Sequence, residues 1–286
     1  MESRSRRRVS GTLVALVLGA VSLTALARAS AGPPEQTGVF ALLGGTPKIV
    51  SKFWAEHGAG SSATLKFRQF QLDGTTPILN YDMDMEKLAH VVVIRDDFAT
   101  FAHLHPAFDT TTGTFSQQFT KEANHRYYVY ADTVPQSIGQ QVFRFTMESD
   151  GPVATASLPH GASPPRAAAG PYTVTLSATQ LPAGEPQTLD LTVLRDGHLA
   201  SDLGTYLGAA AHAIFINVKT LAYVHVHPHV PGAQDEMETN MGMGAAAGPR
   251  LRMSLPALPA GAYALWVQFR GSNDKLYTAP FTISTR

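Results

Sequence analysis

Six of the eleven histidines fall in two copies of one short pattern. In each copy a His precedes an apolar run, and the sequence His-x-His-Pro follows it. The two copies are 122 residues apart at all three positions. Three neutral imidazoles on one face are a suitable ligand set for Zn²⁺ or Cu²⁺. The candidate metal ligands are His90, His103, His105, His212, His225 and His227.

The spacing of these histidines predicts a hairpin of two β-strands. Side chains alternate along a strand, so His103 and His105 share one face while Ala102 and Leu104 occupy the core face. We therefore expect the histidines to point outward or toward the rim of the sheet. If His90 pairs opposite His105, all three rings share one face about 5 Å apart. A slip of one residue would move His90 to the other face.

A structural interpretation of the same histidines remains open. A His near the end of a strand and followed by Pro can hydrogen-bond a loop carbonyl and end the strand. The repetition of the same three positions in both copies favours metal binding over this alternative.

Methionines and a further histidine lie near both copies. Thioether sulfur is a soft ligand that selects Cu(I), so His and Met together favour copper, with zinc second. The nearby carboxylates, Asp84 among them, are expected to be solvated loop residues, with metal ligands or groups that orient the imidazoles as the alternative. The candidate accessory ligands are Met83, Met85, His229, Met241 and Met243.

The elements that must position these residues are strands. Short β-branched or aromatic runs are separated by Gly, Pro and Asp, without a sustained helical period. This pattern predicts two tandem immunoglobulin-like antiparallel β-sandwich domains, an all-β fold. The expected strands are 63–71, 91–95, 127–131, 142–147, 172–177, 188–194, 213–218, 263–269 and 281–284.

Composition divides the chain into five segments. An Arg-rich start, a short apolar run and Ala-Arg-Ala predict a cleaved export signal rather than a membrane span. Removing it leaves 17 basic and 21 acidic residues, which argues against nucleic acid as a partner. The predicted segments are a signal peptide 1–29, a flexible lead-in 30–46, a first domain 47–157, a linker 158–171 and a second domain 172–286.

The absence of cysteine excludes several classes of site. The chain of 286 residues has no Cys, so it holds no disulfide, thiolate zinc site or blue-copper centre. The sequence also has no G-x-S-x-G elbow, P-loop or H-E-x-x-H motif. We therefore expect a protein that is not an enzyme, although a tri-His zinc or copper enzyme remains an alternative.

The paired segments LAHVVVIRDDFATFAHLHP and AAHAIFINVKTLAYVHVHP resemble exported bacterial proteins with YtkA-like or copper-resistance-protein-C-like domains. The resemblance covers residues 60–150 and 172–286 and is specific around the histidine motif. It implies an immunoglobulin-like fold, a periplasmic or extracellular location and copper binding at the six motif histidines.

Together these observations predict an exported, non-catalytic protein that binds metal, with one tri-His site per domain for sequestration or transfer. Its expected partners are a metal ion and another metal-handling protein of the cell envelope. We expect no partner nucleic acid and no membrane span after the signal is removed. A structural or adhesive tandem sandwich is the alternative from a different class.

Overall fold

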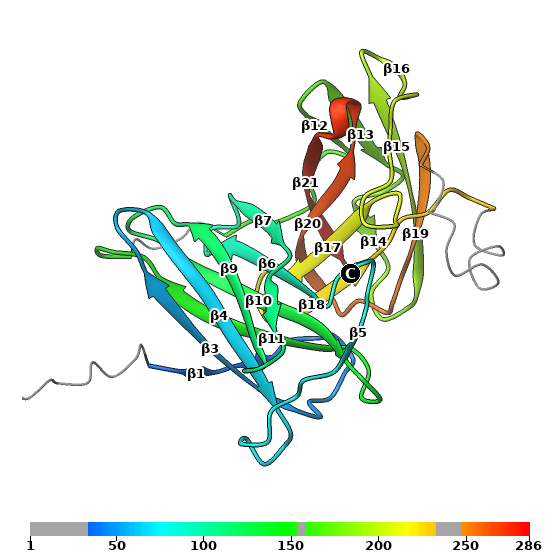
Figure 1. Cartoon of the computed structure of the whole chain (residues 1–286). Coiled ribbons are helices and arrows are strands. Elements are labelled where there is room, and N and C mark those ends of the chain that lie inside the picture. The colour runs from blue at the N-terminus through cyan, green and yellow to red at the C-terminus, as the bar shows by residue number, and fades with distance from the viewer. Residues whose placement is uncertain (1–33, 154–157, 233–246) are drawn as a thin grey trace, which may run out of the picture. The chain divides into compact units, whose positions relative to one another are not determined.

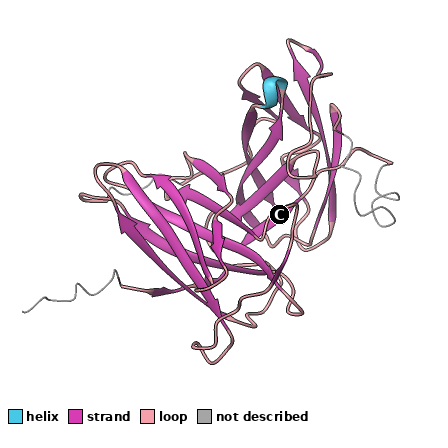
Figure 2. Cartoon of the chain, viewed as in Figure 1, coloured by secondary structure: helices cyan, strands magenta, loops and turns pink. Residues whose placement is uncertain are grey.

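The computed structural model describes residues 34–153, 158–232 and 247–286. Within these ranges the regular secondary structure is β-strand (Figure 2), apart from the short 3-10 helix Ser272–Asp274. No helix in the described ranges is long and apolar enough to cross a membrane. The predicted all-β fold is confirmed, and the predicted signal peptide lies outside the described residues.

The first half of the chain forms two facing sheets (Figure 1). One sheet has the strand order β1 (Gln36–Thr37), β3 (Val50–His57), β4 (Ser62–Phe70), β9 (Thr114–Thr120) and β8 (Ala107–Asp109). The other has the order β2 (Val39–Phe40), β11 (Gln141–Glu148), β10 (Arg126–Pro135), β6 (Ala89–Arg95) and β7 (Phe101–Leu104), with β5 (Tyr81–Asp82) pairing with β10.

The second half repeats this arrangement with two more sheets. One sheet has the order β12 (Arg166–Ala169), β13 (Tyr172–Leu176), β15 (Gln187–Arg195) and β16 (His198–Leu199), with β19 (Arg250–Leu255) pairing with β15. The other has the order β14 (Gln180–Leu181), β21 (Leu276–Thr285), β20 (Gly261–Arg270), β17 (His212–Asn217) and β18 (Tyr223–Val226).

Each half has its own hydrophobic core, as alternation along the strands predicts. In β4 the buried residues Leu65 and Phe67 face Val129 and Phe145 of the opposite sheet. The second half buries an equivalent set that includes Leu191. Burial of one face of each sheet against the other is the main force that forms such a sandwich.

A third core lies between the two halves. Strands β6 and β17 are buried on both faces, and Val92 and Ile94 of the first pack with Ile214 and Ile216 of the second. All four residues are fully buried, with 0% of their surface exposed. Residues 33–286 consequently form one compact unit. Continuous apolar runs are what strands with two buried faces require.

Two of the predicted segment types differ in the structure. Part of the predicted flexible lead-in is ordered strand, because β1 and β2 add to the edges of the first two sheets. Its next residues also pair across the halves, since the Tyr223 amide donates to the Ala41 carbonyl at 2.8 Å. The predicted linker contains β12, which pairs with β13.

The predicted hairpins form in both halves, in the register that brings the three histidines together. Val92 pairs with His103 in the first hairpin, and Ile214 pairs with His225 in the second. One step further along each ladder places His90 opposite His105 and His212 opposite His227. The three histidines of each half therefore share one face of their sheet.

Candidate metal centre

The six motif histidines form one cluster between the two halves. Their shared face is the outer face of each sandwich, and the other half covers it. The ring centroids of His90 and His225 are 5.4 Å apart, and those of His103 and His212 are 5.3 Å apart. The histidines point outward from their own sandwich, as expected, but the two triads meet instead of forming two separate sites, because the outer faces pack together.

Two tight turns place the first histidine of each triad. Asp84 and Lys87 exchange two backbone hydrogen bonds of 2.9 and 3.0 Å, and Tyr206 and Ala209 do the same at 2.8 and 3.1 Å. The central residues have positive φ in both turns, including the non-glycine Met85 at 44°. This left-handed backbone conformation is disfavoured for residues other than glycine. Both turns therefore hold a strained geometry that aims a carbonyl at a histidine.

These carbonyls fix the tautomer of His90 and His212. His90 Nε2 lies 2.9 Å from the Asp84 carbonyl oxygen, and His212 Nε2 lies 3.0 Å from that of Tyr206. A carbonyl only accepts, so Nε2–H must be the donor in both rings. Each neutral ring then keeps its lone pair on Nδ1.

A glutamine from the second half fixes the tautomer of His103. Its Nδ1–H donates to Gln268 Oε1 at 3.1 Å, and Gln268 Nε2 donates in turn to Thr278 Oγ1. The free lone pair of His103 is therefore on Nε2. That nitrogen lies 2.9 Å from His90 Nδ1, which also carries a lone pair. Two acceptors face each other without a proton between them.

In the second half, the carboxylate of Asp132 contacts His225 in the way that the amide of Gln268 contacts His103. His225 Nδ1 lies 3.3 Å from Asp132 Oδ2 of the first half, and both side chains are 1% exposed. When Nδ1–H donates to the carboxylate, the lone pair of His225 Nε2 faces His212 Nδ1 at 3.1 Å. Burial raises the pKa of Asp132 to about 7.

Burial keeps the histidines neutral near pH 7. Desolvation lowers the pKa of His212 to about 3 and that of His227 to about 4. It holds the pKa values of His103 and His225 well below the ordinary 6.5. A metal ion binds the neutral imidazole, so these rings can become ligands without first releasing a proton.

The last histidine of each triad completes the set. His105 Nε2 and His227 Nε2 are buried, and neither has a hydrogen-bond partner among the described residues. Their rings lie 5.1 and 4.8 Å from those of His90 and His212. Buried polar atoms are normally paired, and the exceptions often mark an absent ion or water.

Three overlapping groups of side chains have ligand atoms within 4.8 Å of one another. The first is the predicted triad of the first half. The second group combines residues of both halves, and the third includes a carboxylate that we expected to be solvated. The groups are His90, His103 and His105; His103, His212 and His225; and Asp84, His225 and His227.

The predicted accessory ligands differ in their burial where the structure describes them. Met83 is 70% exposed, and Met85 is partly buried in the turn before β6. His229 is buried, but its backbone pairs with Arg252 and it belongs to none of the three groups. Met241 and Met243 lie outside the described residues.

The sequence reasoning missed Asp132 and Gln268. Each is a buried polar residue in a mostly apolar strand, β10 or β20, and each pairs with the first histidine of its own half. Each then contacts the second histidine of the other half. An isolated polar residue in a buried strand was the signal that could have identified them.

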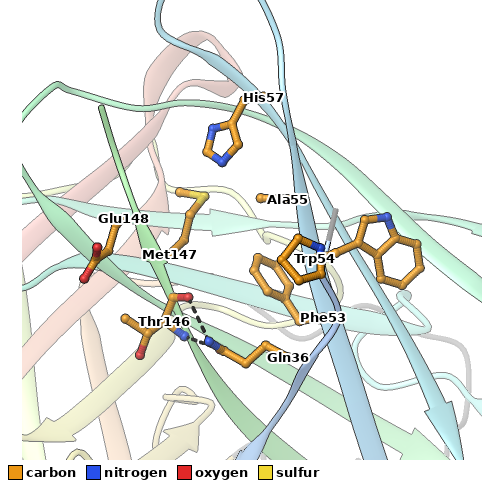
Figure 3. Close-up of a pocket in the computed structure, with 9 residues that line it drawn as sticks. Gln36, Phe53, Trp54, Ala55, His57, Thr146, Met147 and Glu148 are labelled. Carbon is orange, nitrogen blue, oxygen red and sulfur yellow. Dashed lines mark hydrogen bonds between the residues drawn. The ribbon is translucent and has the colours of Figure 1, made fainter. Parts of the chain in front are cut away.

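A separate pocket of about 260 Å³ lies between β1, β3 and β11, far along the chain from the motif. Gln36, Phe53 and His57 line it, and Gln36 hydrogen-bonds the backbone of Thr146 (Figure 3). It contains none of the six motif histidines. The histidine cluster, rather than this pocket, concentrates the groups with ligand chemistry.

Comparison with known proteins gives a family and little else. Residues 51–151 and 166–286 match the model of a family described as "Domain of unknown function (DUF8832)". No curated protein matches the chain. A solved red sea bream transglutaminase matches with 10% identity and a TM-score of 0.23, covering 84% of this chain and 32% of that one. A TM-score of this size carries no argument about activity.

Proposed function

The chain belongs to the DUF8832 family, and since that family's description names no activity, we propose a function from the histidine cluster. The protein is an exported, non-catalytic copper-binding protein that sequesters the metal or passes it to another protein of the cell envelope. The metal lies between the two halves, among the histidines of both.

The facing nitrogens of His90 and His103 carry this proposal. Both lone pairs are fixed by other hydrogen bonds, and the nitrogens are 2.9 Å apart. Two nitrogens that each lie about 2.0–2.1 Å from one metal ion, at about a right angle, are about 2.9 Å apart. A metal ion bound to both nitrogens would satisfy the two acceptors at once.

The ligand chemistry favours copper over zinc. Imidazole nitrogen binds both ions, and divalent copper is the stronger binder at a given nitrogen site. The exposed Met83 gives no support for a thioether ligand, so the argument for copper rests on imidazole alone. Gln268 and Asp132 orient ligand rings in the way that increases metal affinity in known sites.

Dense packing around the ligands supports a binding role rather than catalysis. His90 is 1% exposed and His212 is 0% exposed, which leaves little space beside the metal for a substrate. His105 and His227 are only partly buried and give the metal a route to solvent. The predicted export signal of residues 1–29 supports a location outside the cytoplasm.

A structural role for the histidines is the second candidate. The hydrogen bonds from His90 and His212 to turn carbonyls support it, since they hold strand and turn together. This candidate expects every buried ring nitrogen to find a partner within the protein. The unpartnered His105 Nε2 and His227 Nε2 argue against it.

Metal titration of the purified protein tests the proposal. After chelator treatment, we expect stoichiometric uptake of Cu²⁺, weaker uptake of Zn²⁺, and reduced Cu²⁺ uptake in His103→Ala. His198→Ala is the matched control, because His198 is exposed in β16 and outside the cluster. Circular dichroism of each variant confirms its fold. Absence of stoichiometric binding of Cu²⁺, Cu(I) and Zn²⁺ to the wild-type protein would overturn the proposal.

A further inference from the structure

The three groups of ligand atoms form a continuous chain of sites. The first group, around His103, and the third, around His225, have no residue in common. The middle group contains His103 and His225 together with His212. Six histidines and one carboxylate are more ligands than a single four-coordinate ion accepts. The arrangement therefore has ligands for two ions.

The two ions would lie close together. Ligand atoms of His103 and His225 are within 4.8 Å of each other. With each nitrogen about 2.0–2.1 Å from its own ion, the two ions are at most about 9 Å apart. Both ions would lie inside the interface, and each half would supply ligands to the combined site.

The two positions differ in charge. The second-half histidines His225 and His227 have a carboxylate oxygen of Asp84, from the first half, within 4.8 Å of their ligand nitrogens, and Asp132 contacts His225. At the corresponding places on the other side are neutral groups. Tyr206 has the turn position of Asp84, with its ring 6.0 Å from that of His105, and Gln268 has the strand position of Asp132.

We infer that the cluster holds two divalent metal ions as one binuclear centre, in which Asp84 of the first half is a ligand to the ion bound by His225 and His227 of the second half. The other ion is bound by His90, His103 and His105 through nitrogen alone. This inference rests on the proposed metal binding. It adds the number of ions, the difference between their two positions, and a ligand from one half that binds the ion of the other half.

The carboxylate decides which position fills first. Two dications a few ångströms apart repel each other, and the charge of Asp84 offsets that repulsion at one position only. The first Cu²⁺ therefore occupies the Asp84 side. The second Cu²⁺ then binds at the all-histidine position, close enough to the first for magnetic coupling between them.

Electron paramagnetic resonance with stepwise addition of Cu²⁺ tests the inference on the full chain. We expect two Cu²⁺ per chain, an isolated copper spectrum at one equivalent, and broadening or loss of signal at two. Asp84→Asn should weaken one of the two binding events by tenfold or more and leave an isolated spectrum from the other. Asp82→Asn is the matched control, because its carboxylate is exposed two residues away.

The outcomes separate this inference from the proposed function. One Cu²⁺ per chain, two Cu²⁺ with additive isolated spectra, or unchanged binding in a folded Asp84→Asn variant would each overturn the binuclear inference and leave metal binding intact. No binding of Cu²⁺ by the wild-type chain would overturn both. Circular dichroism of Asp84→Asn establishes that the variant folds.

Discussion

At the residue scale, the hydrogen bonds of each imidazole decide what it can bind. His103 gives its only proton to Gln268, and His90 gives its proton to a turn carbonyl. Their remaining nitrogens face each other 2.9 Å apart as two acceptors. A neutral imidazole has one donor and one acceptor, so with Gln268 Oε1 facing His103 neither ring has a proton left for this contact. A cation between the rings does.

Replacing Gln268 by leucine removes the acceptor that fixes the tautomer of His103. Loss of a group that orients a metal-bound histidine lowers the metal affinity by roughly 10–100-fold. We expect a loss of this size for Cu²⁺ in Gln268→Leu, measured by competition with a chelator of known affinity. Gln71→Leu, at an exposed position, should bind as the wild type does. Equal affinity of the two variants would contradict the role of Gln268.

Acid should destabilise the metal-free protein. Burial lowers the pKa of His212 to about 3 in the folded chain, against 6.5 in the unfolded chain. Between these values the unfolded state binds more protons, so stability is complete above pH 6.5 and falls as the pH decreases toward 3. His212 alone accounts for about 1 kcal/mol between pH 7 and pH 5.5.

The other cluster histidines act in the same direction, whereas Asp132 acts in the opposite one. Its pKa is raised to about 7 by burial, so it favours the folded state as the pH falls from 7 toward 3.8. One carboxylate opposes several histidines, and the net effect is a loss of stability. Urea unfolding at pH 7 and pH 5.5 measures it. A free energy of unfolding that rises at pH 5.5 would contradict the account.

At the scale of elements, the hairpins β6–β7 and β17–β18 position the six histidines, and strands β6 and β17 also form the core between the halves. In β6 and β17 the side chains alternate between the core of their own half and the core between the halves. Hence Val92 and Ile214 stabilise the interface, while their neighbours stabilise a sandwich. The histidines continue the row that faces the interface, so the pairing register aligns ligands and interface together.

Ile214 tests this double burial. It points away from the core of its own half and is 0% exposed because the first half covers it. We expect Ile214→Ala to lower the free energy of unfolding by roughly 2–5 kcal/mol, as for a buried core residue. Leu199→Ala, at a position 43% exposed, should change it by less than about 0.5 kcal/mol. Denaturant unfolding measures both, and equal small effects would contradict burial between the halves.

At the scale of the whole molecule, the two halves meet through reciprocal contacts. Tyr130 of the first half stacks on Tyr223 of the second at 5.3 Å, and Trp266 of the second stacks on Phe101 of the first at 5.0 Å. Asp132 and Gln268 make the same exchange at the histidines. Such reciprocity is the property of a two-fold symmetric dimer interface, present here within one chain.

Cutting the chain between the halves should leave them associated. With a protease site introduced at residues 154–157, we expect both fragments to elute together in gel filtration after cleavage. The reciprocal aromatic contacts and the third core supply the affinity. Trp266→Ala should weaken the association, and Trp54→Ala, in the first half and outside the third core, should not. Separate elution of the wild-type fragments would contradict the account.

Much of each half follows from the sequence, and the contact between the halves does not. The alternation in the strands predicted the fold, and the spacing of His90, His103 and His105 predicted the hairpin but left its register open. Both are local properties of a strand and its neighbour. The meeting of two triads depends on packing between residues about 120 apart. The apolar runs of β6 and β17 were its one local signal, because they predict two buried faces.

The measurement that tests the central claim most directly is anomalous scattering at the copper edge from crystals soaked in or grown with Cu²⁺. The account predicts strong density within bonding distance of His103 and His225, between the two halves. Density only at surface histidines such as His198, with none among the six motif histidines, would contradict it.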